Sequence, residues 1–554
     1  MRRMLKGKRS SIFALLVCLL PAPALAQNAV GGDCGPADGE QTAFIRDGAV
    51  SRALHARLNA CGPFAVDGHA LDRQALAAFY RDRGYQPLWV GEQGALPAAR
   101  TLLEQIRKAD RDLLQPGDYA PDAIAARLDA QRPAGLAELE LLASHAFAEY
   151  GVDLDRGSVS SEMNFLNDAV APRDASYGSI LDRAAGAASL ERFVRDRRDL
   201  NPIYVGLRDG LPQLRREQEA QDRVTIPDGP VVARGERDER VPLLRQRLGL
   251  QPPQDASESD LYTADLAQAV ERFQQANGLA ADGLLGPNTR AVLNTSLQDR
   301  VRIARLNLER ARWLPREMGE RHIVVDIPGF RVRLFEDGRQ VASMRAIVGQ
   351  EYNRTPPFAD RAEYIQVNPY WNVPNSILTN EIAPKMLDDP GYLAENNMEV
   401  LSGWGGGAHV LDPSRVNWRA ASRGDAGFRV RQRPGPENAL GQVKFMFPNR
   451  YSIYLHDTPH QELFEKSRRT FSHGCIRVEE PMRLAEFLLQ DTSGAGREDV
   501  ARLIASGERE RIGLDARVPV YITYFTAWPA ADGSIEFRPD VYGRDAELRD
   551  QMFE

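Results

Sequence analysis

The sequence predicts a multi-domain α+β protein with a helical scaffold, a small three-helix domain, and a β-rich C-terminal domain that carries a capping insertion. The chain has 554 residues, more than one hydrophobic core usually organises, so two to four domains are expected. Apolar residues recur at helical spacing through residues 71–220 and alternate at strand spacing from residue 322 onward. Hydrophobic residues make up 43% and charged residues 27%, a profile typical of soluble globular proteins.

Residues 1–26 are predicted to be a secretory signal peptide. Five basic residues precede an apolar run of about 10 residues, and Ala24-Leu25-Ala26 matches the small-x-small pattern of a cleavage site. An uncleaved membrane anchor is the alternative, but spanning a bilayer takes ~20 apolar residues. We expect export and cleavage after Ala26. The Arg2-Arg3 pair leaves open whether the general or the twin-arginine route is used.

The charge balance argues against a nucleic-acid partner. The net charge is −7, and five of the 70 basic residues lie in the signal segment, while the chain has 77 acidic residues. Proteins that bind nucleic acid usually present an excess of positive charge. We therefore expect no nucleic acid among the partners.

Four cysteines occur, and export makes their pairing informative. Cys18 leaves with the signal peptide. Cys34 and Cys61 flank a predicted helix, and we expect them to form a disulfide. Cys475 is then an odd thiol, which can be a buried structural residue, half of an intermolecular bridge, or a reactive group.

The chain divides into consecutive regions at changes of pattern and at segments rich in Pro and Gly. Residues 375–442 form a long insertion of this kind inside the β-rich region, and such insertions often act as a lid or substrate wall, although a purely structural role is the alternative. The predicted order is a signal peptide at 1–26, an N-terminal extension at 27–70, a helical scaffold domain at 71–225, a small domain at 226–297, a connector helix at 298–319, and a β-rich domain at 320–554 with the capping insertion at 375–442.

The small domain shows three short helical patterns. Val241, Leu244 and Leu248 share one helical face, a second helix is expected over residues 265–276 with Gly278 as its C-cap, and Gly286-Pro287 opens a third. The segment resembles the three-helix peptidoglycan-binding domain through Tyr262-Thr263, Val270, Phe273-Gln274, Gly278-Leu279, Asp282-Gly283, and Gly286-Pro287-x-Thr289. The resemblance implies a contact with the sacculus glycan through residues 226–297. Alternatively, these residues only build a small helical bundle.

The β-rich region begins with a predicted hairpin. Residues 323–327, 331–335 and 340–348 read as strands, and Asp337-Gly338 between the last two is a strong hairpin signal. Residues 450–456 are predicted as a further strand. Residues 518–528 and 534–537 are predicted to form a second hairpin near the C-terminus.

The candidate site lies in the stretch from His456 to Arg477. Cys475 becomes nucleophilic if its thiolate is stabilised, and His473 can accept the thiol proton and later return it to a leaving amine. Gly474 allows a sharp turn that brings N–H groups toward the reacting carbon as an oxyanion hole. Arg477 can hold a substrate carboxylate, and His456 can reach the same pocket from a second strand.

A zinc site is the alternative for these side chains. His456, His460, His473 and Cys475 could supply four ligands. Pro459 and the strand-like residues before it argue against the helix that would place the first two together. We expect neither a metal nor another cofactor.

The stretch resembles the signature of the L,D-transpeptidases with a YkuD-type catalytic domain. His456 lies 17 positions before His473, which belongs to the block Ser472-His473-Gly474-Cys475-Ile476-Arg477-Val478. The resemblance is to the large multi-domain Gram-negative members, which also carry helical scaffold and peptidoglycan-binding domains. Further matching segments are 367–374, Asp389-Pro390-Gly391-Tyr392, Asn396-Asn397-Met398, and 431–441.

The resemblance implies a periplasmic cysteine acyltransferase. Cys475 would attack a meso-diaminopimelate carbonyl in a tetrapeptide stem, release D-alanine, and pass the thioester to an amine of a neighbouring stem as a 3→3 cross-link. His473 would be the base, His456 would shape the oxyanion site, and the N–H groups of Gly474 and Cys475 would stabilise the tetrahedral oxygen. The family also implies acylation by carbapenems and a role in cell-wall organisation and cell shape, with other cell-wall synthases as further partners.

Several assignments stay open at the level of sequence. The substrate-binding residues are expected to be Arg477, Ser472, Tyr454 and Trp371, the last two of which could equally be sheet core. The partner that orients His473 could be Asp457 or a backbone carbonyl.

The acceptor of the thioester is also open. Water, a free D-amino acid or a lysine of an envelope protein could replace the neighbouring stem. A wall-binding scaffold with an idle thiol is the alternative from another class of protein.

Overall fold

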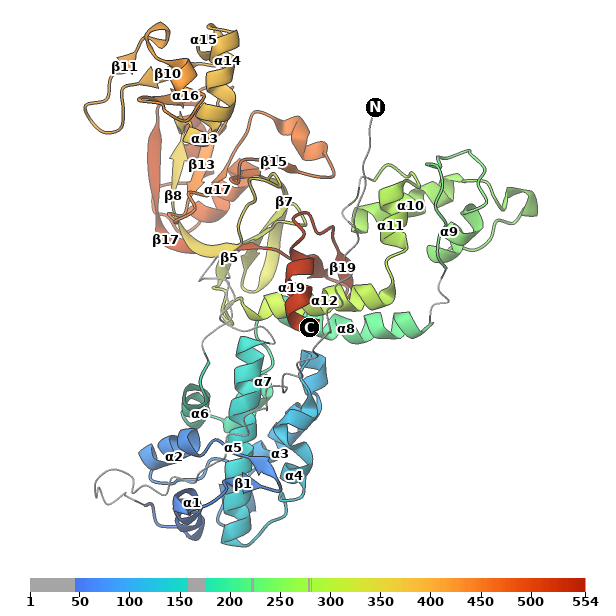
Figure 1. Ribbon diagram of the computed structural model, residues 1–554, viewed down its shortest axis with the longest axis vertical. Helices are drawn as coiled ribbons and strands as arrows, with labels where there is room; N and C mark the ends of the chain where they lie inside the picture. The colour runs from blue at the N-terminus through green and yellow to red at the C-terminus, as the bar shows by residue number, and fades with distance from the viewer. Residues whose placement is uncertain (1–44, 158–174, 221–223, 278, 280, 554) are drawn as a thin grey trace, which may run out of the picture.

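The computed structural model describes residues 45–157, 175–220, 224–277, 279 and 281–553. The predicted signal peptide, Cys18, Cys34 and Gly278 lie outside these residues. Three lobes are visible in Figure 1: a helical lobe that contains α1–α7, a small lobe around α9–α11, and a β-rich lobe that begins at β5. Helical lobes followed by a β-rich C-terminal domain confirm the predicted α+β class. Within the described residues, no helix has the length and apolar character needed to cross a membrane.

The first lobe is built around one long buried helix. α5 (Pro133–Arg156) is surrounded by the other helices, and their apolar faces form one core. Cys61 in this lobe is disulfide-bonded. The remaining elements are α1 (Ala49–Asn59), β1 (Ala65–Val66), β2 (His69–Ala70), α2 (Arg73–Asp82), β3 (Val90–Gly91), β4 (Gly94–Ala95), α3 (Pro97–Arg107), η1 (Ala109–Asp112), η2 (Pro116–Tyr119), α4 (Pro121–Ala125), α6 (Tyr177–Ala185) and α7 (Leu190–Asp196).

The small lobe has the three predicted helices. They are α9 (Val241–Arg247), α10 (Ala264–Ala276) and α11 (Pro287–Leu293), with the short η3 (Ala256–Glu258) between the first two. Val241, Leu244 and Val270 are fully buried in its core. Gln274 fixes the turn that follows α10, because its side chain bonds the backbone of Gly283 and Leu284 and the hydroxyl of Thr289.

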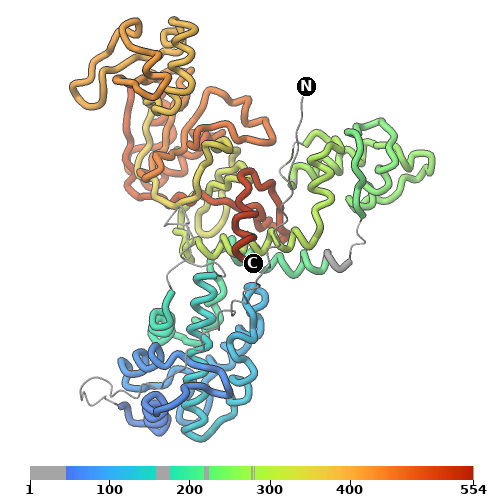
Figure 2. Tube along the Cα trace, in the orientation of Figure 1, coloured from blue at the N-terminus to red at the C-terminus, as the bar shows by residue number. Residues whose placement is uncertain are grey.

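Two helices join the lobes. α8 (Pro202–Ala220) leads into the small lobe and α12 (Leu297–Arg312) returns from it, and the two lie side by side (Figures 1 and 2). Their core also includes residues of β18 (Ala527–Pro529) and β19 (Ile535–Phe537). Gly206 and Gly210 permit this packing, since a Cβ there would lie 2.5 Å from the Cβ of Pro529 and 2.8 Å from a carbon of Ile535.

The β-rich lobe contains a nine-stranded sheet that closes on itself. The order is β15-β7-β16-β14-β13-β8-β17-β5-β6, and β6 also pairs with β7. An apolar core fills the interior. The strands are β5 (Arg321–Asp326), β6 (Arg331–Glu336), β7 (Arg339–Gly349), β8 (Phe358–Val367), β13 (Val443–Met446), β14 (Leu455–His456), β15 (Thr470–Ser472), β16 (Ile476–Val478) and β17 (Glu510–Thr523), accompanied by η6 (Gln461–Glu465), α17 (Pro481–Leu489), α18 (Arg497–Ser506) and α19 (Arg544–Phe553).

A separately cored subdomain interrupts the sheet between β8 and β13. Its four strands pair in the order β11-β10-β12-β9 and its helices cover an apolar core of their own. It stands at the top of Figure 1, beyond the end of the main sheet. The elements are β9 (Trp371–Asn372), α13 (Asn375–Ile377), the π-helical turn η4 (Leu378–Ile382), α14 (Ala383–Asp388), α15 (Tyr392–Glu395), β10 (Met398–Leu401), β11 (Val410–Leu411), η5 (Pro413–Arg415), α16 (Trp418–Ala421) and β12 (Arg429–Gln432). We call it the cap.

Two predicted strands differ from the structure. Only Leu455–His456 of the predicted strand 450–456 is a strand, because the side chain of Asn449 bonds the backbone of Tyr451 and Ile453 and holds a turn there. The predicted strand 518–528 is split between β17 and β18, since the N–H of Thr526 donates to the side chain of Asn307 instead of to a strand. The hairpin at Asp337-Gly338 is confirmed, and both turn residues have positive φ.

Candidate active site

Cys475 lies in a tight turn between two strands that both pair with β7. β15 ends at Ser472 and β16 begins at Ile476, so three residues carry the chain from one strand to the next. Gly474 in this turn has φ +111°, a conformation that residues with a Cβ rarely adopt. The sequence predicted this sharp turn at Gly474.

Buried hydroxyl groups hold the turn in place. The Ser472 hydroxyl donates to the carbonyl of Cys475 and accepts from the N–H of Gly474 at 3.1 Å. The Thr355 hydroxyl donates to the carbonyl of Gly474 at 2.8 Å. Ser472 is only 2% exposed, which supports a structural role for its hydroxyl over direct contact with a substrate.

The Cys475 thiol is a free thiol and is partly exposed. Its Sγ lies 3.8 Å from the carbonyl oxygen of Ser452, a residue with a positive φ of +56°. Burial raises the pKa of the thiol, while hydrogen bonds from Tyr454 and the charges of Lys444 and Arg477 act in the opposite direction. Because burial prevails, the resting group is a thiol that needs a base.

Lys444 approaches the thiol from the neighbouring strand. It pairs with His456 across β13 and β14, and its Nζ lies 3.7 Å from the centre of the Tyr454 ring. Burial lowers the pKa of Lys444 to about 8, and the charge of a Cys475 thiolate would raise it. Lys444 is therefore a desolvated cation that lies over an aromatic face.

His456 sits behind the thiol as a neutral imidazole. It is 4% exposed, and its Nδ1 lies 2.5 Å from the carbonyl oxygen of Asp457. Burial, followed by the charge of Arg477, lowers the pKa of His456 to about 3. At neutral pH this side chain can donate or accept a hydrogen bond, but it does not carry a charge.

Arg477 lies beside His456 in the parallel pair of β14 and β16. Its Nε is buried and finds no hydrogen-bond partner among the described residues. In that part of the chain neither Arg477 nor Lys444 forms an ion pair with a carboxylate within 4.0 Å, although the charge of Glu462 acts on Arg477 from further away. Desolvated cations without a direct carboxylate partner are costly, so the site is suited to receive negative charge.

His473 reaches away from the main sheet toward the cap. Its Nε2 lies 2.7 Å from Oε1 of Glu381, and the two side chains are 33% and 42% exposed. Asp457, which the sequence offered as the orienting partner, is engaged elsewhere. Its two carboxylate oxygens accept the N–H groups of Gln442 and Thr458.

The structure thus gathers some predicted residues and separates another. Tyr454 and Arg477 act on the thiol of Cys475, and His456 in turn contacts the Tyr454 ring and lies within reach of the Arg477 charge. The predicted base His473 makes its described contact with Glu381 of the cap. Trp371 belongs to β9 and packs against the core of the cap.

Sequence reasoning missed two charged side chains of this site. The sequence does indicate Lys444, because it is a lone cation inside the apolar run 443–447. Nothing in the sequence indicates the contact of Glu381, because it lies 92 positions before His473.

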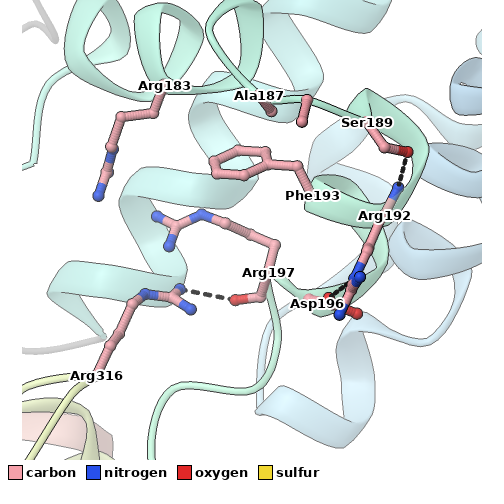
Figure 3. A pocket seen from close by; sticks show the side chains of 9 residues that line it. Arg183, Ala187, Ser189, Arg192, Phe193, Asp196, Arg197 and Arg316 are labelled. Carbon is pink, nitrogen blue, oxygen red and sulfur yellow. Dashed lines mark hydrogen bonds and ion pairs between the residues drawn. The ribbon is translucent and has the colours of Figure 1, made fainter.

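A hollow of about 460 Å³ lies in the scaffold lobe, where four arginines line it (Figure 3). Each of them has a carboxylate partner. Arg192 pairs with Asp196, and Arg183, Arg197 and Arg316 each pair with Asp155. These arginines differ in this respect from Lys444 and Arg477, which form no ion pair within 4.0 Å in the described residues.

Family models match three segments of the chain. Residues 320–519 match the L,D-transpeptidase catalytic domain (YkuD), residues 74–211 match a scaffold domain, and residues 239–293 match a "putative peptidoglycan binding domain". The arrangement agrees with the order of the three lobes.

Individual proteins give a narrower likeness. A "Putative L,D-transpeptidase" of Haemophilus influenzae is 35% identical over 247 residues, which is 44% of this chain and 48% of the relative, so the match spans about half of that protein's length. The crystal structure of an L,D-transpeptidase (residues 123-326) from Xylanimonas cellulosilytica matches 54% of this chain and 99% of its own, at 18% identity and a TM-score of 0.16. A TM-score this low carries no argument about the fold.

An extracytoplasmic location is consistent with a family that acts on the cell wall. With its catalytic, scaffold and peptidoglycan-binding segments all matched, this chain is similar to the L,D-transpeptidases with a YkuD-type catalytic domain.

Proposed function

We propose that this protein forms 3→3 meso-diaminopimelate cross-links in peptidoglycan through a thioester on Cys475. The observation that carries the proposal is a free, partly exposed thiol flanked by two desolvated cations, Lys444 and Arg477, that have no carboxylate partner in the described residues. Negative charge develops on sulfur and on the carbonyl oxygen during acyl transfer. Cations placed in advance stabilise that charge without reorganisation.

The first half of the reaction would use His473 as the base. Burial raises the pKa of Cys475, so His473 takes the thiol proton as sulfur attacks the diaminopimelate carbonyl. A C–S bond forms, the C–N bond to D-alanine breaks, and His473 returns the proton to the leaving amine. The product is a thioester on Cys475.

The oxyanion site is proposed to centre on the N–H of Cys475. The N–H of Gly474 already donates to the hydroxyl of Ser472, so Gly474 contributes mainly the shape of the turn. His456 is neutral and shapes the pocket from behind. We assign Arg477 and Lys444 to the substrate carboxylate, with Tyr454 lining the cleft below Lys444.

The second half transfers the acyl group to an amine of a neighbouring stem. That nitrogen attacks the thioester, His473 takes its proton, the C–S bond breaks, and the thiolate is protonated again. The small lobe would hold the enzyme on the sacculus glycan in the periplasm. Water, a D-amino acid or an envelope lysine remain the alternative acceptors of the same thioester.

Mass spectrometry of the mature protein with a disaccharide-tetrapeptide tests the proposal. We expect a transient adduct on Cys475, released D-alanine, and a tripeptide-containing dimer. The Cys475→Ala variant should give none of these while keeping its fold and its binding to sacculi. D-alanine release by that variant would disprove the assignment of the nucleophile, and tripeptide monomer alone would identify water as the acceptor.

A further inference from the structure

A row of polar side chains crosses one face of the main sheet. Each member faces the next across a strand pair, in the order Arg477, His456, Lys444, Gln366 and Arg511. Residues that face each other in register point to the same side of a sheet. The row therefore runs from the candidate active site on β16 and β14, across β13 and β8, to β17.

This row lies on the face turned away from the apolar core. One position along each strand, five apolar residues pair in the same order and form or pack against that core, namely Ile476, Leu455, Phe445, Ile365 and Ile512. Because successive side chains of a strand alternate, the polar row points the other way. Its exposure rises along its length, since His456 is buried, Lys444 and Gln366 are half-buried, and Arg511 is exposed.

Two exposed arginines, Arg509 and Arg511, end the row, and we call them the outer pair. The guanidinium of Arg511 lies 3.7 Å from the centre of the Tyr364 ring. In the amide orientation that satisfies both groups, the Gln366 oxygen accepts from Nη2 and Nε of Arg509 at 2.7 and 2.6 Å. In the described part of the chain neither arginine has a carboxylate within 4.0 Å. Since an arginine has five N–H donors, both keep donors for a ligand.

The outer pair belongs to the same field of positive charge as the active site. Besides burial, the charge of Arg509 lowers the pKa of Lys444, so these two cations repel each other. Four strand steps of about 4.8 Å separate β16 from β17, which places the outer pair about 19 Å along the sheet from Arg477. Clustered cations without a carboxylate partner favour a negatively charged ligand. The outer pair is thus a place for a second carboxylate, apart from the one assigned to Lys444 and Arg477.

We propose that Arg509 and Arg511 form an outlying subsite for a carboxylate of the peptidoglycan stem, with Gln366 and Tyr364 positioning the two guanidinium groups. The inference rests on the proposed function, which supplies the stem as substrate. Arginine binds a carboxylate in bidentate fashion, and an aromatic face beneath the guanidinium restricts its orientation. The donor stem and the acceptor stem offer the same carboxylate chemistry, and the rates described below distinguish them.

Binding to the Cys475→Ala variant of the full chain measures the subsite without turnover. On that background, Arg509→Gln combined with Arg511→Gln should raise the Kd of a disaccharide-tetrapeptide about 10-fold by calorimetry, because charged hydrogen bonds are lost. For a tetrapeptide amidated at the carboxylates outside its diaminopimelate unit, the same substitutions should change Kd by less than about twofold. Arg517→Gln is the matched control, since Arg517 is an exposed arginine of β17 that already pairs with Glu363 at 2.9 Å, and it should bind both peptides as its parent does.

Two results would overturn the subsite. The first is an unchanged Kd for the unmodified tetrapeptide in the double variant, which would show that the outer pair does not touch the stem. The second is an equal rise in Kd for the unmodified and the amidated tetrapeptide, which would show that the arginines do not recognise a carboxylate.

Rates in the chain with Cys475 intact, at peptide concentrations below KM, identify the stem that is held. Slower formation of the Cys475 adduct in the double variant assigns the donor stem to the subsite. Slower consumption of the adduct by a tripeptide, which has no D-alanine to lose, assigns the acceptor stem. Unchanged rates in both measurements would overturn a role in the reaction. A wild type that shows the difference in binding but forms no adduct would overturn the proposed transpeptidation and leave the subsite standing.

Discussion

Lys444 is a cation in the middle of an apolar strand, and its burial has a cost. Desolvation lowers its pKa to about 8 from 10.5, so the folded protein binds that proton less tightly than the unfolded chain does. The cost is fully present below pH 8 and fades as the pH rises toward 10.5. Such a cost is typical of a functional residue.

The Lys444→Met variant should therefore be more stable and less active. We expect its free energy of unfolding at pH 7 to rise by about 1–2 kcal/mol, and acylation of Cys475 to slow at least about 10-fold. Urea unfolding at pH 7 and at pH 10 measures the first effect, which should shrink at the higher pH. Unchanged stability together with unchanged acylation would show that Lys444 is a solvated side chain without a role.

His456 predicts a loss of stability in acid. Burial lowers its pKa to about 3 from 6.5. Between pH 3 and pH 6.5 the histidine is therefore protonated in the unfolded chain but not in the folded protein. The contribution is present above pH 6.5 and is lost as the pH falls toward 3, at up to about 1.4 kcal/mol per pH unit. His456→Gln should flatten the pH dependence of unfolding in this window, measured by urea titration. The exposed His409 supplies the control, because a flattening by His409→Gln would contradict the argument.

Site residues could be predicted from the sequence where they are neighbours in the chain. The turn from Ser472 to Cys475 was readable because its members are neighbours in the chain. The contact between His473 and Glu381 was not, since it depends on where the cap packs. Sequence spacing carries no information about a contact made by tertiary folding alone.

At the scale of elements, the turn before β14 places the Ser452 carbonyl beside the thiol. The Asn449 side chain bonds the carbonyls of Phe447 and Ile453 and the N–H groups of Tyr451 and Ile453. The sequence alternates there like a strand, which explains why residues 450–456 were predicted as one. A side chain that competes for backbone hydrogen bonds overrides the alternation.

Removing that side chain should loosen the turn. Asn449→Ala should lower the free energy of unfolding by about 2 kcal/mol, because several backbone groups lose their partner, and should speed alkylation of Cys475, because the Ser452 carbonyl accepts from the neutral thiol and moves away. Chemical denaturation and iodoacetamide kinetics measure the two effects. Asn449→Asp keeps the two accepted bonds and should be affected less. Equal effects of both substitutions would show that the hydrogen bonds accepted by the Asn449 side chain do not stabilise the turn.

At the scale of the whole molecule, the small lobe is inserted between α8 and α12. These helices pack on each other and on β18 and β19 in one core, and the catalytic sheet and the small lobe have separate apolar cores. The test is to replace residues 224–295 by about 12 Gly and Ser residues, which reach up to about 40 Å. The turnover of a small muropeptide should stay within about twofold of the wild type. Sacculus binding should fall strongly. Retained binding in a sedimentation assay would remove the small lobe's proposed role.

The same hairpin of α8 and α12 has a mechanical consequence. A tensile load on the small lobe is carried by two adjacent helices, and their shared core would have to slide along its length before either helix could detach. Both helices pack on β18 and β19, which continue from β17 in the catalytic sheet. Under the proposed binding of the small lobe to the wall, stretching of the wall would thus load the domain that contains Cys475.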